Sequence, residues 1–203
     1  DSITNYAISK KMTPGIQVVV ARKGKVIYQK SFGNHTYEST QKVNNTDVYD
    51  IASLTKIVAT LPNVMQEFDK GHLTLETKLK AMLPMARNSN KENATVLDML
   101  THQARFQPWI PFYKATLDSL NRPSTHFYRS EFSDEFPIHV ADKLYLRKDY
   151  NDSIVKTILY SELLPKKQYK YSDFTFILFK EYLELHSKKS LEDLAHANFF
   201  EPL

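Results

Sequence analysis

The predicted strands and helices are unevenly distributed along this sequence, and their distribution limits the folds that are open to it. Two β-branched runs, at 16–21 and 26–32, flank a tight turn at 22–25 and predict a β-hairpin. After residue 50 the patterns are mainly helical, apart from residues 138–146, which read as extended. A hairpin is not stable alone in water, so we expect its sheet to include strands from elsewhere. The sequence therefore predicts an α+β protein.

Length and composition exclude several classes of protein. With 203 residues, the chain is long enough for one substantial domain, expected to span 1–203, with a hairpin part at 1–52 and a mostly helical part at 53–203. No apolar run approaches the roughly 20 residues of a membrane helix, so no membrane span is expected. The net charge of +4 is small and both signs are interspersed, so no nucleic-acid partner is implied. Without cysteine, disulfides and thiolate metal sites are excluded.

The longest apolar helical pattern starts at Ser53 and runs to about Lys70. Gly71 then suits the left-handed residue that closes a helix. Pro62 lies inside this pattern, where it is expected to kink the helix or leave a carbonyl unpaired. A spacing near 3.6 residues predicts a buried stripe, formed by Ile57, Val58, Leu61, Val64, Met65 and Phe68.

Ser53 and Lys56 stand three residues apart at the start of this helix, so their side chains are expected to share one face. A serine hydroxyl becomes a good nucleophile when an adjacent base takes its proton. A lysine whose pKa is lowered by burial is one such base. The helix N-terminus also favours the negative charge that forms during acyl transfer. The alternative is that Ser53 only caps the helix.

The S-x-x-K spacing occurs three times, and its surroundings distinguish the copies. Ser39 with Lys42 lies in a polar loop, and Ser153 with Lys156 opens a helix where capping is the ordinary role. Only Ser53 combines an apolar approach with a long apolar helix. The context therefore favours Ser53 as the nucleophile.

Further helices are expected along the chain, some with recognisable caps. Thr95 and Asp98 have the spacing of a capping box, and Ser190 is placed to cap the last helix. Pro165 is expected to end the helix before it. The predicted helical ranges are 1–12, 73–83 (short or irregular), 96–102, 112–120, 149–164, 174–186 and 190–200.

Other residues with chemical potential have structural alternatives. Tyr171 could act as a general acid or base beside an ammonium, or be a half-buried core tyrosine. Asp173 is placed to cap the helix at 174. Trp109, the single tryptophan, could line a substrate cleft or cover the core. The seven histidines show no metal-ligand spacing, and no G-x-S-x-G motif is present.

An ordered set of motifs carries a family resemblance over nearly the whole chain. The chain resembles the serine β-lactamase and penicillin-binding superfamily, on the side of class C β-lactamases, DD-peptidases and related esterases. The motifs are the G-I-Q-V-V-V hairpin at 15–20, Ser53-Leu54-Thr55-Lys56, Gly71-His72-Leu73-Thr74-Leu75, Leu100-Thr101-His102, Tyr171-Ser172-Asp173 and Phe199-Phe200-Glu201-Pro202-Leu203.

The resemblance implies roles for particular residues. Ser53 would be acylated, while Lys56 and Tyr171 would transfer protons. Asp173 stands where the family has a substrate-binding asparagine, and its charge is expected to raise the pKa of Lys56, which favours Tyr171 as the proton acceptor. Arg105 stands where the family usually has glycine, so we expect it to fill or gate part of the cleft. Trp109 is a further candidate for substrate contact.

The family's third motif, K-T-G or H-x-G on a strand, requires a glycine, and none follows Gly71. The resemblance implies an antiparallel sheet flanked by helices plus a helical lobe, with the C-terminal strands absent from this chain. We therefore expect an incomplete domain, poorly active alone, with an unpaired hairpin edge that could promote association.

The sequence thus favours a serine hydrolase that forms an acyl-enzyme at Ser53 on an amide, ester or β-lactam carbonyl. The alternative is a non-catalytic protein that keeps the fold and binds penicillin or peptidoglycan peptides. The expected partner is a small-molecule or peptide substrate, and no metal or organic cofactor is implied. The resemblance also suggests an exported, periplasmic or cell-envelope protein.

Overall fold

A computed structural model describes all 203 residues and divides them into two compact units, Asp1–Ala52 and Ser53–Leu203. This boundary is the one at which the sequence patterns change from hairpin to helix. The two units are described separately below. None of the helices has both the length and the apolar character needed to cross a membrane.

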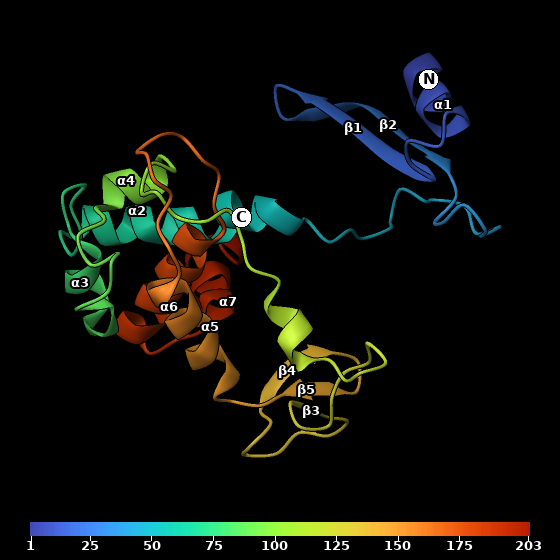
Figure 1. The fold of residues 1–203 in the computed structure, drawn as a ribbon. Coiled ribbons are helices and arrows are strands. Elements are labelled where there is room, and N and C mark those ends of the chain that lie inside the picture. The colour runs from blue at the N-terminus through green and yellow to red at the C-terminus, as the bar shows by residue number, and fades with distance from the viewer. The chain divides into compact units, whose positions relative to one another are not determined.

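The first unit contains the predicted hairpin. Helix α1 (Ser2–Ser9) precedes strands β1 (Gly15–Arg22) and β2 (Lys25–Gly33), which pair antiparallel with Gly15 opposite Gly33 (Figure 1). Gly33 has a φ of +73°, and a Cβ there would lie 2.2 Å from the Pro14 carbonyl oxygen, so this position requires glycine. The two strands pair only with each other, which leaves an unpaired edge on each, as expected.

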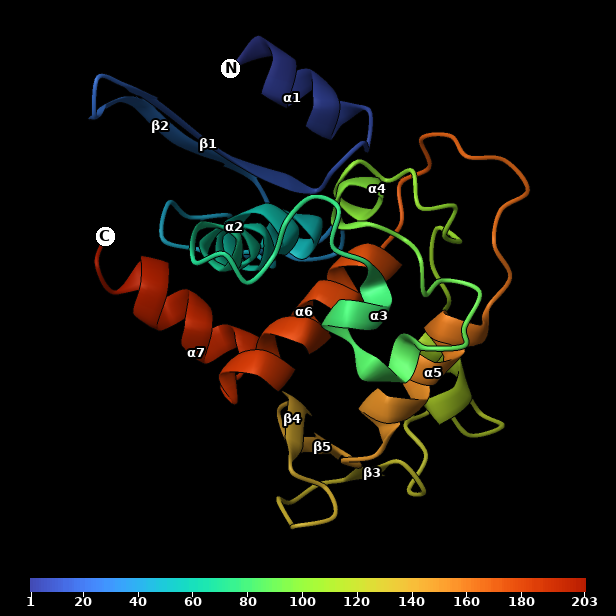
Figure 2. The same ribbon diagram turned by 90° about the vertical axis from the view of Figure 1, so that its left-hand side faces the viewer.

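The second unit is mainly helical and holds the hydrophobic core. Helix α6 (Phe174–Ser187) contacts α2 (Leu61–Asp69), α5 (Tyr150–Tyr160) and α7 (Leu191–Ala195), and Figure 2 shows it among them. The other α-helices of this unit are the shorter α3 (Leu79–Met82) and α4 (Val96–Leu100). The largest buried side chains of the core include Leu79, Met99, Ile158, Phe174, Phe179 and Tyr182.

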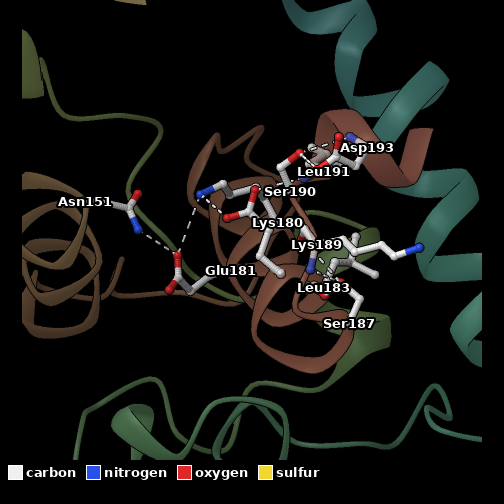
Figure 3. A network of polar contacts seen from close by, with 10 residues as sticks. Asn151, Lys180, Glu181, Leu183, Ser187, Lys189, Ser190, Leu191 and Asp193 are labelled. Atoms are coloured by element: carbon white, nitrogen blue, oxygen red, sulfur yellow. Dashed lines mark hydrogen bonds and ion pairs between the residues drawn. The ribbon is translucent and has the colours of Figure 1, made fainter. Parts of the chain in front are cut away.

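Polar contacts join α5, α6 and α7 (Figure 3). Asn151 on α5 donates to Glu181 on α6 at 2.9 Å.

Ser190 caps α7 as predicted, since its hydroxyl accepts from the Asp193 N–H at 3.0 Å. The capping box on α4 is also confirmed, because Thr95 and Asp98 accept from each other's backbone N–H groups.

A small antiparallel sheet occupies the region that gave only a weak strand signal. Strands β3 (Tyr128–Arg129), β4 (Ile138–Ala141) and β5 (Leu144–Leu146) pair in the order β3-β5-β4. The prediction of extended structure at 138–146 is therefore confirmed, and the chain combines helices with small antiparallel sheets. The helix predicted at 112–120 is shorter and is a 3₁₀ turn at Phe112–Thr116.

The predicted buried stripe of the Ser53 helix is wrong for most of its members. Ile57, Val58, Met65 and Phe68 are exposed, whereas Ala59, Thr60, Asn63 and Val64 are buried. The cause lies in the backbone: a 3₁₀ turn at Ala52–Leu54 and a π-helical turn at Lys56–Thr60 precede α2. The wider π turn places one extra residue in the helix, so the face that packs on α6 and α7 is not the face that a uniform period predicts. The irregularity comes directly before Pro62, near the position where one was expected.

Candidate active site

Ser53 and Lys56 lie at the start of the second unit, and their side chains meet. The Lys56 Nζ donates to the Ser53 Oγ at 3.1 Å. Both belong to the short turns that precede α2, where a three-residue spacing brings side chains together. Ser53 is exposed, whereas Lys56 is half-buried, so the hydroxyl is open to a substrate while its partner is held by the protein.

Lys56 is surrounded by the other two predicted proton-transfer and binding residues. Its Nζ lies 2.7 Å from the Asp173 Oδ1 and 5.3 Å from the centre of the Tyr171 ring. Partial burial alone would lower the pKa of Lys56, but hydrogen bonding to Asp173 and Tyr171 outweighs it. The pKa of Lys56 therefore lies above its ordinary value, in the direction expected from an aspartate at this position.

The segment 170–173 is fixed by backbone contacts with the loop at 102–108. The Ser172 hydroxyl donates to the Gln107 carbonyl at 2.6 Å and accepts from the Phe174 N–H at 3.2 Å. The Asp173 N–H donates to the Pro108 carbonyl at 2.9 Å. Ser172 is buried, so these bonds are shielded from water. They orient Tyr171 and Asp173 towards Lys56.

His102 is a neighbour of the site to which sequence reasoning gave no role. Its ring centre lies 4.7 Å from that of Tyr171, and its Nδ1 accepts from the Ser172 N–H at 3.2 Å. Burial, followed by the charge of Lys56, lowers the pKa of His102, so the ring is neutral near pH 7 and able to accept this bond. The sequence did mark His102 as part of the Leu100-Thr101-His102 motif. Its position along the chain could not show that it would contact Tyr171 and Ser172.

Arg105 and Trp109 belong to the loop at 102–109, and neither has a described hydrogen bond or ion pair with Ser53 or Lys56. Arg105 has a φ of +62°, a left-handed conformation that explains why glycine suits this position. Its Nε donates to the Leu164 carbonyl at 2.6 Å, which anchors the side chain on the segment after α5. Trp109 is exposed and directly follows Pro108, whose carbonyl is bonded to Asp173. Contact of either residue with substrate stays a prediction.

The other two S-x-x-K copies have different surroundings. Ser39 accepts from the backbone of Gln41, and Ser153 lies within α5, where its hydroxyl donates to the Asp149 carbonyl. Neither hydroxyl is bonded to the lysine three residues later. The structure therefore brings serine and lysine together at Ser53 and Lys56 alone.

Comparison with known proteins shows sequence relatives of modest identity. Protein flp from Staphylococcus aureus (strain MW2) is 26% identical over 125 residues, which are 60% of this chain and 25% of that protein. Esterase EstB from Burkholderia gladioli is 24% identical over 114 residues, which are 54% of this chain and 29% of that protein. The matched parts thus span between a quarter and a third of these curated relatives.

Solved structures share the fold over almost all of the chain. The octameric penicillin-binding protein homologue from Pyrococcus abyssi superposes with a TM-score of 0.69 at 20% identity, covering 99% of this chain and 41% of that one. Class C β-lactamases are also among the similar structures. The sequence matches the description of the Beta-lactamase family over residues 5–203. The chain therefore belongs to the β-lactamase family, with the β-lactamase and transpeptidase type of fold.

Proposed function

We propose that this protein is a serine hydrolase that forms an acyl-enzyme at Ser53. The observation that carries the proposal is the 3.1 Å contact between the Ser53 Oγ and Lys56 Nζ, with Tyr171 and Asp173 around the same ammonium. This arrangement has the parts of an activated nucleophile: an exposed hydroxyl, a cation beside it and an acid–base side chain next to the same cation. Membership of a family with β-lactamase and esterase relatives supports hydrolysis as the reaction class.

The proposed reaction begins when the Ser53 Oγ attacks the substrate carbonyl carbon and its proton passes to Tyr171, acting as its phenolate. The ion pair with Asp173 favours the protonated form of Lys56, which makes Tyr171 the better acceptor. The Lys56 ammonium would stabilise the phenolate, and the Ser53 backbone N–H would donate to the oxyanion. Tyr171 then returns the proton to the leaving group, and water cleaves the ester in the second half of the reaction.

The proposed substrates are small molecules or peptides with an ester, β-lactam or D-amino-acid amide carbonyl. Trp109 and Arg105 are candidates to contact them, from the loop that is bonded to Asp173. We also infer that the protein works outside the cytoplasm, as expected from the resemblance to cell-envelope enzymes. The activity of the whole protein is part of the same proposal, because the chain spans less than half of the similar structures' length.

The direct test is covalent labelling of the chain by a fluorescent penicillin and by a fluorophosphonate, with the adduct located by peptide mass spectrometry. We expect an adduct on Ser53 that Ser53→Ala abolishes, while the matched variants Ser39→Ala and Ser153→Ala keep it. An adduct on Ser39 or Ser153 would contradict the proposal. Saturable binding of penicillin without any adduct would instead identify a non-catalytic binding protein.

A further inference from the structure

A second cluster of chemically able side chains lies outside the Ser53 site and shares no residue with it. Glu67 on α2, His72 in the turn after α2, and His186 near the end of α6 each offer one possible ligand atom. These three atoms all lie within 4.8 Å of one another. The acyl-transfer chemistry proposed above uses none of these residues.

The local backbone explains why Glu67 and His72 face each other. Gly71 adopts a φ of +76° after the end of α2 and turns the chain back, so that the His72 N–H donates to the Glu67 carbonyl at 2.9 Å. The His72 Nδ1 then lies 2.7 Å from the Glu67 Oε2. This pair is fixed by the turn itself, independently of any contact with α6.

The third residue comes from the helix that packs against α2. The ring of His186 lies 5.7 Å from that of His72 and 5.0 Å from that of Tyr182, measured between centres. No hydrogen bond of the structure uses a ring nitrogen of His186, so its nitrogens are available to a ligand. The same residues line a cavity of about 210 Å³ that also includes Asn63 and Asn198.

A second observation concerns the buried Tyr182 beside this cluster. Its side chain is 2% exposed, and its hydroxyl has no hydrogen-bond partner in the protein. Buried polar groups normally have a hydrogen-bond partner, and the protein supplies none to this hydroxyl, which lies on α6 one helical turn before His186.

We propose that Glu67, His72 and His186 form a site for a divalent transition-metal ion, with Zn²⁺ as the expected occupant. Two imidazoles and one carboxylate form a ligand set that Zn²⁺ prefers, at about 2.0–2.2 Å from the metal. Ligand atoms of a tetrahedral zinc lie about 3.3 Å apart on that geometry. Small side-chain rotations would therefore close the observed cluster around an ion. Three protein ligands would leave the fourth position of a tetrahedral ion open to water.

Lys70 competes with the ion in this arrangement. Its ammonium lies 3.0 Å from the Glu67 Oε1, while the Oε2 faces His72. Lys70 is largely exposed and can move into solvent when a cation arrives. The bound ion would join α2 to α6, so binding is expected to stabilise the packing between these two helices.

The test uses the purified 203-residue chain, freed of metal with EDTA and titrated with ZnCl₂ by isothermal calorimetry. We expect one Zn²⁺ per chain and a rise in Tm on saturation, but no binding of Mg²⁺, which prefers oxygen ligands. His72→Ala and His186→Ala should each weaken Zn²⁺ binding more than about tenfold. Lys70→Met should strengthen it, because the competing ammonium is removed.

The matched control is His139→Ala, which removes a histidine that lies on β4 and packs on Tyr145. Zn²⁺ binding should be unchanged in this variant, and circular dichroism spectra should show that all variants are folded. The proposal is overturned if the wild-type chain shows no saturable Zn²⁺ binding. It is equally overturned if His186→Ala and His139→Ala bind Zn²⁺ as tightly as wild type.

Discussion

Two lysines of the second unit are enclosed by protein, and their surroundings act on the ammonium in opposite ways. Lys56 has a carboxylate partner in Asp173, which keeps its pKa above the ordinary value despite partial burial. Lys91 is 1% exposed and donates to Asn90 and to the carbonyls of Leu159 and Ser161, with no carboxylate paired to it. Burial lowers its pKa to about 8. The presence or absence of one nearby carboxylate therefore decides the sign of the shift.

Asp173→Asn tests the first of these lysines. The change removes a negative charge beside Lys56 that opposes the proposed Tyr171 phenolate, so this proton acceptor should form at lower pH. We expect the pH at which Ser53 labelling is half-maximal to decrease by about one unit or more. Rates of fluorophosphonate labelling between pH 6 and 10 provide the measurement. A profile identical to that of wild type would show that the ion pair does not control proton transfer.

Lys91→Met tests the effect of burial on the pKa of Lys91, the enclosed lysine that has no carboxylate partner. The pKa of Lys91 is about 8 in the folded protein against 10.5 as the ordinary value, so the unfolded chain binds more protons between these pH values. The contribution of Lys91 to stability therefore increases as pH rises from about 8 to 10.5, by about 3 kcal/mol at most. Urea unfolding at pH 7.5 and 9.5 should show this rise in wild type relative to Lys91→Met. A difference between the two proteins that does not change with pH would contradict the shift.

At the scale of elements, the first turn of α6 and the loop at 102–108 form one support for the candidate site. Ser172 joins them, because its hydroxyl bonds both the Gln107 carbonyl and the Phe174 N–H. His102 adds a ring against Tyr171 and a bond to the Ser172 N–H. None of these residues is proposed to touch substrate, so they are positioning residues.

Ser172→Ala should therefore lower the rate of Ser53 labelling as well as stability. The buried Phe174 N–H and the half-buried Gln107 carbonyl lose their partner, at a cost of about 1–3 kcal/mol, and Tyr171 and Asp173 lose an anchor. The control is Ser190→Ala, which removes the cap of α7 at a cost of about 1 kcal/mol. Ser190→Ala should leave the labelling rate unchanged. Urea unfolding and labelling rates on both variants distinguish positioning from a general loss of stability.

The elements with a strong local signal could be predicted from the sequence. Phe174–Ser187 has a long helical pattern, and Thr95 and Ser190 have side chains that cap by themselves. The π turn at Lys56–Thr60 has no such signal, because it depends on how this segment packs on α6 and α7. The two- to four-residue strands β3, β4 and β5 are too short for alternation to be distinctive.

The same distinction applies to the candidate site. Ser53 and Lys56 are three residues apart, so helix geometry predicts their contact. Tyr171 and Asp173 were assigned from the resemblance, because no local rule places them beside Lys56. Contacts such as that of His102 with Ser172 join residues 70 positions apart, and only the folded chain reveals them.

At the scale of the whole molecule, the first unit has the unpaired strand edges that the sequence analysis anticipated, together with exposed apolar side chains. Strands β1 and β2 pair only with each other, and Val19, Val26 and Ile27 are exposed on them. Unpaired strand edges with apolar side chains promote association between chains. Apolar surface of this kind also marks sites of protein–protein contact.

We predict that the 203-residue chain self-associates through this hairpin as its concentration rises. Val19→Lys places a charge on β1 and should reduce association, since a lysine on an edge strand opposes pairing with another chain. Tyr160→Lys, at the end of α5, is the control for an exposed apolar residue elsewhere. Sedimentation velocity at several concentrations measures the effect. Equal association of both variants and wild type would exclude the hairpin as the contact.

The bonds between segment 170–173 and the loop at 102–108 also affect when the site forms during folding. They join residues 65 and 70 positions apart, so they form only after a long loop has closed. Ser53 and Lys56 are only three residues apart, but the π turn that carries Lys56 packs on α6 and α7. In a chain emerging from the ribosome, their contact would therefore become fixed only after these helices have been synthesised. Ser53, the proposed nucleophile, would gain its lysine and tyrosine neighbours together, when the helical unit closes.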